Sequence, residues 1–172
     1  MHGSDTSNFG TQRGFTYVAM LVAVAIIGIG LAAAGQVWSV ASQREREQKL
    51  LFVGHEIRHA IRLYYEQTPG AVKRYPMTLE DLLADKRYPN VKRYLRRIYP
   101  DPMTGKSEWG MVAAPGGGVQ GVYSVSPERP LKQSGFEPQD VALQGAASFA
   151  AWRFIYDPTS YLASPAPARV PR

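Results

Sequence analysis

Cysteine is absent from this sequence, which excludes a disulfide framework and thiolate metal sites. A small domain without such cross-links is held together by burial of apolar side chains or by packing against other chains. Charge is also absent over one long stretch, because no Asp, Glu, Lys or Arg occurs from Phe15 to Gln43. The first absence limits how the chain is stabilised, and the second marks a segment that differs from the rest.

The chain has 172 residues, of which 45% are hydrophobic, so one modest domain remains once the charge-free segment is set aside. Its formal net charge is +6. This charge permits attraction to anionic lipid, nucleic acid or an acidic protein, and it does not distinguish among them.

The charge-free segment is dense in Val, Ala, Ile and Leu, and it predicts a transmembrane helix over residues 15–43. At about 1.5 Å per residue this helix would reach roughly 40 Å, which exceeds the ~30 Å hydrocarbon thickness of a bilayer. A secretory signal peptide has a shorter apolar region and ends in a small-residue cleavage site before a polar mature start. Here the sequence continues with a helical pattern, so we expect a membrane anchor.

The helical pattern extends beyond the apolar segment. From Arg44 to Glu66 apolar residues recur at helical spacing, whereas another face carries charged and polar side chains. The apolar positions are Leu50, Val53, Ile57, Ile61 and Tyr64, and the other face carries His55, Arg58, Arg62 and Glu66. We therefore predict one continuous helix from Phe15 to about Gln67, apolar all round in its first half and amphipathic in its second.

Stop signals follow the long helix at Thr68-Pro69-Gly70. The segment from Tyr75 to Leu83 then predicts a second, shorter helix. Thr78 is its expected N-cap, and the acidic residues that follow suit its first turn.

Three short strands are predicted at Trp109–Val112, Val119–Ser126 and Trp152–Tyr156, with a hairpin turn at Gly116 to Gly118. The segment between the second and third strands is expected to be mostly loop. A small antiparallel sheet that covers the amphipathic half of the long helix is the most economical packing, which predicts an α+β fold.

The junction Arg13-Gly14-Phe15-Thr16-Tyr17 places a glycine and a phenylalanine between a short polar leader and the apolar run. This arrangement resembles the type III signal of prepilins, in the family of type IV pilins and type II secretion pseudopilins. The resemblance implies that a prepilin peptidase cleaves after Gly14 and methylates the new N-terminus at Phe15. The family usually carries a glutamate at the fifth mature position, where this chain has Ala19, which favours a minor or divergent subunit.

The order of motifs in the head resembles the major pseudopilin of type II secretion. The shared motifs are Tyr75-Pro76, Leu79-Glu80-Asp81-Leu82, Asp101-Pro102, Trp109-Gly110 and Gly121-Val122-Tyr123-Ser124-Val125. The resemblance implies a pilin-like fold in which the long helix packs on the sheet. Calcium is not carried over from the family, because the segment after Ser126 lacks the expected aspartates, and no cofactor is expected.

A different chemistry is suggested by His55-Glu56-Ile57-Arg58-His59, which matches the H-E-x-x-H pattern of zinc peptidases. In that pattern His55 and His59 would bind the metal and Glu56 would act as the base. The flanking arginines would repel a dication, and the only other histidine lies in the predicted leader. A solvated helix face is therefore the favoured interpretation. No nucleophile set can be assembled from the other residues, so we expect no catalytic residues.

A basic stretch runs from Lys86 to Arg97 and has two tyrosines between its cations. The residues proposed to bind an anionic partner are Lys92, Arg93, Arg96 and Arg97. Phosphate attraction and base stacking would suit a DNA-binding minor pilin. We favour a basic surface that answers an acidic patch on a neighbouring subunit or the anionic surface of membrane lipid.

Taken with the resemblance, these features predict a noncatalytic pseudopilin of a type II secretion system, anchored by a single span in the inner membrane with its head in the periplasm. The expected divisions are a leader at 1–14, a transmembrane helix at 15–43, a head at 44–159 and a disordered tail at 160–172. Expected partners are other pseudopilins, the prepilin peptidase, the inner-membrane assembly platform and membrane lipid. The alternatives are a type IV minor pilin that binds DNA or a surface, and the zinc peptidase.

Overall fold

The structure is a computed structural model that describes residues 12–159, except for the side chains of residues 12–15 and 29–37. Its helix and strands are α1 (Gln12–Glu66), β1 (Gly110–Ala113), β2 (Val119–Tyr123) and β3 (Arg153–Ile155), and its 3₁₀ helices are η1 (Leu79–Leu82), η2 (Pro138–Leu143) and η3 (Phe149–Ala151). The chain forms two compact units, one ending at Ser42 and one beginning at Gln43. The second unit holds the sheet.

The predicted long helix is confirmed as the single element α1, which begins three residues before Phe15 and ends one residue before Gln67. The backbone N–H of Gln67 still donates to the carbonyl of Leu63, at 3.0 Å. The chain then leaves the helix at Thr68, whose hydroxyl donates to the carbonyl of Tyr64. The stop signal therefore acts where the sequence places it.

The three predicted strands are confirmed, and they form one antiparallel sheet in the order β1-β2-β3. Gly110 pairs with Tyr123 across the first two strands, and Val122 pairs with Phe154 across the second two. The predicted hairpin turn joins β1 to β2, with Gly117 at a φ of +87°, a backbone conformation that favours glycine. The coarse prediction of an α+β fold with a small antiparallel sheet is confirmed.

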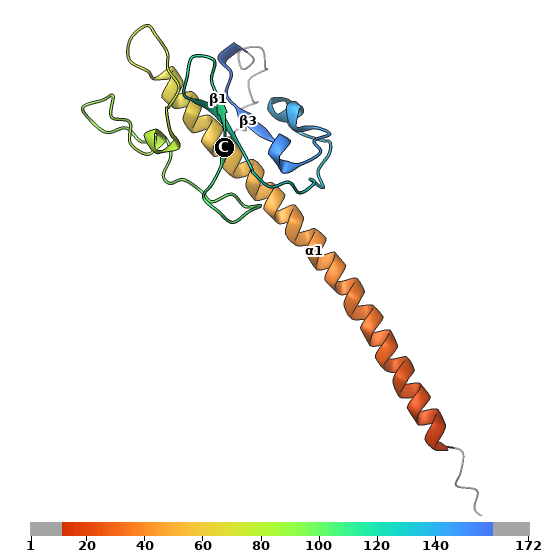
Figure 1. The fold of residues 1–172 in the computed structure, drawn as a ribbon. Coiled ribbons are helices and arrows are strands. Elements are labelled where there is room, and N and C mark those ends of the chain that lie inside the picture. The colour runs from red at the N-terminus through yellow and green to blue at the C-terminus, as the bar shows by residue number, and fades with distance from the viewer. Residues whose placement is uncertain (1–11, 160–172) are drawn as a thin grey trace, which may run out of the picture. The chain divides into compact units, whose positions relative to one another are not determined.

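The core lies between the sheet and the second half of α1, and Figure 1 shows the strands beside this part of the helix. The predicted apolar face of α1 is buried, with Leu50, Ile57 and Ile61 each 0% exposed. From the other side, alternate residues from Trp152 to Tyr156 are buried, as the strand period requires. This shared burial fixes how the head sits on the C-terminal part of α1.

The second predicted helix is much shorter than expected, because only the single 3₁₀ turn η1 forms there. Its start is nevertheless capped as an N-terminus would be. The Asp81 carboxylate accepts hydrogen bonds from the backbone N–H groups of Met77 and Thr78, at 2.9 and 3.1 Å. A capping signature followed by closely spaced apolar residues is found in a single 3₁₀ turn as well as in a longer α-helix. The sequence pattern therefore did not determine the length or the type of this helix.

The segment between β2 and β3 is mostly loop, as predicted, but it is tied closely to α1. The Glu47 side chain is buried in α1, and its carboxylate accepts the backbone N–H groups of Leu131 and Lys132, at 2.5 and 3.2 Å. Gln43 adds a bond from its side-chain amide to the carbonyl of Arg129, at 3.0 Å. These bonds position the segment that carries η2.

The expected location, a single-pass inner-membrane protein with a periplasmic head, is wrong by this structure. Crossing a bilayer takes about 20 consecutive apolar residues in a helix. Within the part of the chain that the structure describes, no helix combines the required length and apolarity. Most of the predicted leader and the whole of the predicted tail, residues 1–11 and 160–172, lie outside the described residues.

Candidate functional site

The H-E-x-x-H residues lie on α1, but they are not arranged as a metal centre. His55 is partly exposed, and its Nε2 lies 2.7 Å from a carboxylate oxygen of Asp140, in η2. Glu56 and His59 are exposed. Among the described residues, no group of three or more His, Cys, Asp or Glu side chains is placed to hold a metal ion. His55 is thus a hydrogen-bond partner of Asp140, and a third zinc ligand is missing from the part of the chain that the structure describes.

Arg58 is the main correction to the predicted charged face of α1. The sequence places it among solvated side chains, whereas it is buried and its Nη1 donates to the second carboxylate oxygen of Asp140, at 3.0 Å. The same nitrogen donates to the carbonyl of Gln139, at 3.2 Å. This face of α1 is covered because η2 brings the Asp140 carboxylate to it. Asp140 is 82 residues from Arg58, so helical spacing does not reveal the contact.

Asp140 is itself buried, with 3% of its side chain exposed. Burial alone would raise the pKa of Asp140, but the hydrogen bond and charge of His55 and the charge and hydrogen bond of Arg58 outweigh it. The pKa of Asp140 is therefore held below its usual value, and the carboxylate is ionised near neutral pH. Together, Asp140, His55 and Arg58 fasten η2 to α1.

The two tyrosines of the basic stretch bear on the DNA-binding alternative, because base stacking requires open ring faces. Neither Tyr88 nor Tyr94 is exposed: the Tyr88 hydroxyl donates to the carbonyl of Gln67, and the Tyr94 hydroxyl donates to Asp85, at 3.0 Å. Lys92 lies over the Tyr88 ring, at 3.8 Å from its centroid. The rings that base stacking would require are thus engaged within the head.

The four cations named for the anionic-partner patch are all exposed, but two of them are already in contact with tyrosines. Lys92 is one, and Arg97 lies 5.0 Å from the centroid of Tyr99. Arg93 and Arg96 point no donor at any acceptor among the described residues. The patch therefore offers isolated exposed charges rather than a built site.

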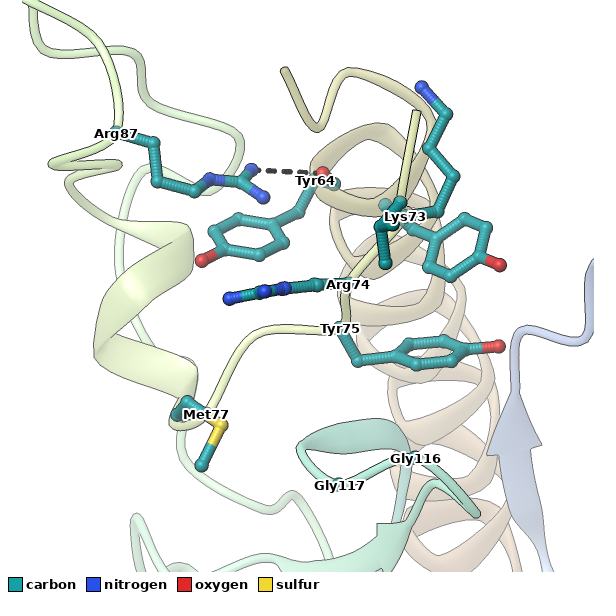
Figure 2. A pocket seen from close by; sticks show the side chains of 10 residues that line it. Tyr64, Lys73, Arg74, Tyr75, Met77, Arg87, Gly116 and Gly117 are labelled. Carbon is teal, nitrogen blue, oxygen red and sulfur yellow. Dashed lines mark hydrogen bonds between the residues drawn. The ribbon is translucent and has the colours of Figure 1, made fainter. Parts of the chain in front are cut away.

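A hollow that the sequence did not predict lies where α1 ends, with a volume of about 680 Å³. Figure 2 shows it bordered by the end of α1, the segment after it and the β1–β2 turn. Its lining residues are Tyr64, Tyr65, Val72, Lys73, Arg74, Tyr75, Met77, Arg87, Gly116 and Gly117. Three cations and three tyrosines thus meet at one place.

Arg87 supports the wall of this hollow. Its guanidinium donates to the carbonyl of Tyr64, the hydroxyl of Thr68 and the carboxylate of Asp85, and it covers the Tyr64 ring at 3.5 Å from the centroid. Burial would raise the pKa of Asp85, but hydrogen bonds from Arg87 and Tyr94 hold that pKa below its usual value. Arg87 is therefore neutralised by a buried partner and stabilises the end of α1.

The first half of α1 is the other unusual feature. Eight apolar side chains between Tyr17 and Ile27 are 52–68% exposed. They are Tyr17, Val18, Met20, Leu21, Val22, Val24, Ile26 and Ile27. Successive residues turn by about 100°, so these side chains point to every side of the helix. Gly14 and Phe15, the predicted cleavage and methylation site, lie within α1, and the structure does not describe the Phe15 side chain.

Comparison with protein-family models, with curated proteins and with solved structures finds no match to this chain. The strongest signal is the exposed apolar part of α1, and the hollow at the other end of the helix is the second.

Proposed function

We propose that this chain is a noncatalytic subunit of a pilin-like fibre, of the kind that drives protein export in type II secretion. Subunits associate through the first half of α1, and the head provides contacts on the fibre surface. The observation that carries the proposal is the exposure of apolar side chains on all sides of α1 between Tyr17 and Ile27. Resemblance at Gly14 and Phe15 supplies the class of fibre.

The physical argument starts from the free energy of exposed apolar surface. Each Val, Leu, Ile or Met side chain gains roughly 1.5–3 kcal/mol when it is fully buried, and seven such side chains are exposed beside Tyr17 on one stretch of helix. A helix that is apolar on every side needs cover on every side. A bundle in which α1 of each subunit is surrounded by α1 of other copies meets that need with a single kind of partner.

The head suits a structural role for a separate reason. Two of its buried carboxylates fasten its own segments: Asp140 joins η2 to α1, and Asp85 holds Arg87 at the end of the helix. His55 is used in the first of these contacts. These groups are therefore committed to stability, which favours a scaffold over an enzyme.

Cysteine scanning of α1 tests the proposal, because the chain has no cysteine of its own. Met20, Leu21 and Val22 are successive exposed residues that point about 100° apart around the helix. Each is replaced singly by cysteine in the full chain, in the cells that produce it, and disulfide-linked dimers are measured after mild oxidation. In a bundle all three positions should crosslink.

The matched control is Val141→Cys, in η2, because Val141 is exposed to a similar degree and reports random collision. Crosslinking at all three α1 positions well above this control supports the fibre. Crosslinking at one α1 position alone would indicate a two-helix dimer. Crosslinking at none of them above the control would overturn the proposal.

A further inference from the structure

The hollow at the end of α1 adjoins a second hollow of about 370 Å³. Val72, Arg74 and Arg87 line both. The second hollow is otherwise bordered by Thr68, Pro69, Gly70 and Ala71, which are small or apolar. The surface is therefore divided into two adjacent depressions with a cationic side chain between them.

Arg74 is the uncompensated charge at this division. Arg87 is paired with Asp85, at 2.8 Å, whereas the Arg74 guanidinium has no hydrogen bond or ion pair to any residue that the structure describes. In Figure 2 its side chain extends into the open space below Tyr64, away from the direction of Tyr75. The five N–H donors of a guanidinium suit a carboxylate, which they bind in a bidentate manner.

Lys73 adds a second positive charge next to Arg74. Its ammonium group donates to the carbonyls of Glu66 and Thr68, at 2.8 and 3.2 Å, at the C-terminal end of α1. An ammonium group has three N–H donors, so one remains for a ligand. Lys73 and Arg74 therefore make the hollow positively charged, whereas the charge of Arg87 is neutralised by Asp85.

Apolar side chains border the same surface and are unusually exposed. Val72 is 69% exposed and Met77 is 71% exposed. Together with Tyr65 and Tyr75, whose rings lie 4.6 Å apart, they give a border of aliphatic, thioether and aromatic groups around a cation. Tyr, Met and Arg are the residues enriched at the centres of protein–protein interfaces.

We propose that these paired hollows bind an acidic peptide segment of a partner protein, with a carboxylate on Arg74 and an apolar side chain in each hollow. A partner segment with an acidic residue between two apolar residues would match this surface, on which Arg74 lies between two hollows. The surface belongs to the head and its binding is measured on single chains, so this proposal is independent of the proposed fibre.

A nucleic acid is a poorer fit to the same cations. Base stacking requires an open ring face. The Tyr64 ring is buried beneath Arg87, and the Tyr75 ring packs against the Tyr65 ring, with 4.6 Å between their centroids. The exposed apolar groups Val72 and Met77 gain nothing from a phosphate backbone.

Fluorescence anisotropy with the full chain tests the proposal. The probe is a short labelled peptide in which one Phe and one Leu flank a central Asp-Glu pair. A matched peptide carries Asn and Gln in place of the acids, and a labelled single-stranded oligonucleotide of the same charge is the third probe. We expect the acidic peptide to bind about tenfold or more tightly than the amide peptide, because charge-assisted hydrogen bonds are the strong ones.

Two variants locate the site. Arg74→Glu should weaken acidic-peptide binding about tenfold or more. Lys106→Glu is its control, because it makes the same change in charge at an exposed residue outside the hollows and should leave binding unchanged. Thermal unfolding of both variants checks that the head remains folded.

A third variant tests the hollow without changing charge. A Cβ added at Gly116 would have no heavy atom within 4 Å, so Gly116→Trp should fold normally while its ring occupies the mouth of the hollow and reduces binding. The proposal is overturned if the acidic peptide does not bind, or if Arg74→Glu and Lys106→Glu weaken peptide binding equally. It is also overturned if Arg74→Glu abolishes binding of the oligonucleotide but leaves binding of the acidic peptide unchanged.

Discussion

The Nε2 atom of His55 lies 2.7 Å from Oδ2 of Asp140, although the two residues are 85 positions apart. This contact and the one between Arg58 and Asp140 place a histidine and an arginine on one buried carboxylate. The H-E-x-x-H pattern of the sequence thus contributes to the tertiary structure through its first histidine. Because Asp140 is buried, we expect its contacts with His55 and Arg58 to contribute strongly to the free energy of unfolding.

Asp140→Asn removes the charge while keeping the shape of the side chain. It leaves the buried Arg58 without its carboxylate, and loss of one partner from a buried pair costs about 3 kcal/mol of the free energy of unfolding. Urea denaturation measures this loss. Glu137→Gln, at an exposed position before η2, is the matched control and should change stability by less than about 0.5 kcal/mol. Equal effects of the two changes would contradict the assigned role of Asp140.

The pKa of Asp140 predicts how its contribution depends on pH. Because that pKa is lower in the folded chain than in the unfolded chain, ionisation stabilises the fold fully above the unfolded value of about 3.9. The contribution is lost as the pH falls through the lower pKa of the folded chain. The difference in unfolding free energy between the wild type and Asp140→Asn should therefore shrink below about pH 4. A difference that grew on acidification would reverse the assignment.

The sequence predicted the elements whose pattern is local and missed the contacts that join distant segments. The period of Leu50, Ile57 and Ile61 on α1 is local, as is the alternation from Trp152 to Tyr156, and both gave the correct buried faces. The partner of Arg58 lies in η2, so the same helical period placed Arg58 in solvent. Only the arrangement of η2 against α1 reveals the pairing.

The hollow at the end of α1 was missed for the same reason. Arg74 and Met77 lie in the segment that follows α1, whereas Gly116 lies in the β1–β2 turn. No local sequence pattern relates these two segments. The basic stretch shows the same limit. Its cations were visible in the sequence, but the inward contact of Arg87 with Asp85 and Tyr64 was not.

Gly54→Ala should destabilise the head, although alanine is the better helix former by about 1 kcal/mol. A Cβ at Gly54 would lie 2.5 Å from ring atoms of Phe154, which lies in β3. Overpacking of this kind costs about 1–3 kcal/mol, so the net change should be a loss. Gly28→Ala is the control, because nothing lies within 4 Å of its added methyl group. Thermal unfolding of the two variants compares them, and a more stable Gly54→Ala head would show that the helix and strand are not in close contact.

Arg87→Met tests the charge that closes the end of α1. The change leaves Asp85 buried, with the Tyr94 hydroxyl as its remaining side-chain donor, and should cost about 3 kcal/mol in urea denaturation. Lys86→Met, at the exposed neighbouring position, should be nearly neutral. Adding Asp85→Asn to Arg87→Met removes the unpaired charge, so the double variant should lose less stability than the two single variants combined. Simple additivity would show that the pair is not coupled.

Cleavage after Gly14 should leave a mature chain that begins at methylated Phe15. This cleavage would remove Gln12 to Gly14, the first residues of α1, so that the helix starts directly with its apolar run. Intact-mass analysis of the chain from its own cells measures both the cleavage and the methyl group. Gly14→Leu should retain the leader, because only a glycine leaves the backbone free of a side chain at the scissile bond, and Ala19→Gly, which lies beyond the junction, should be processed normally. A wild-type chain that still carries its leader in cells with an active prepilin peptidase would separate the chain from the pilin class and leave the exposed apolar helix as an association surface of another kind.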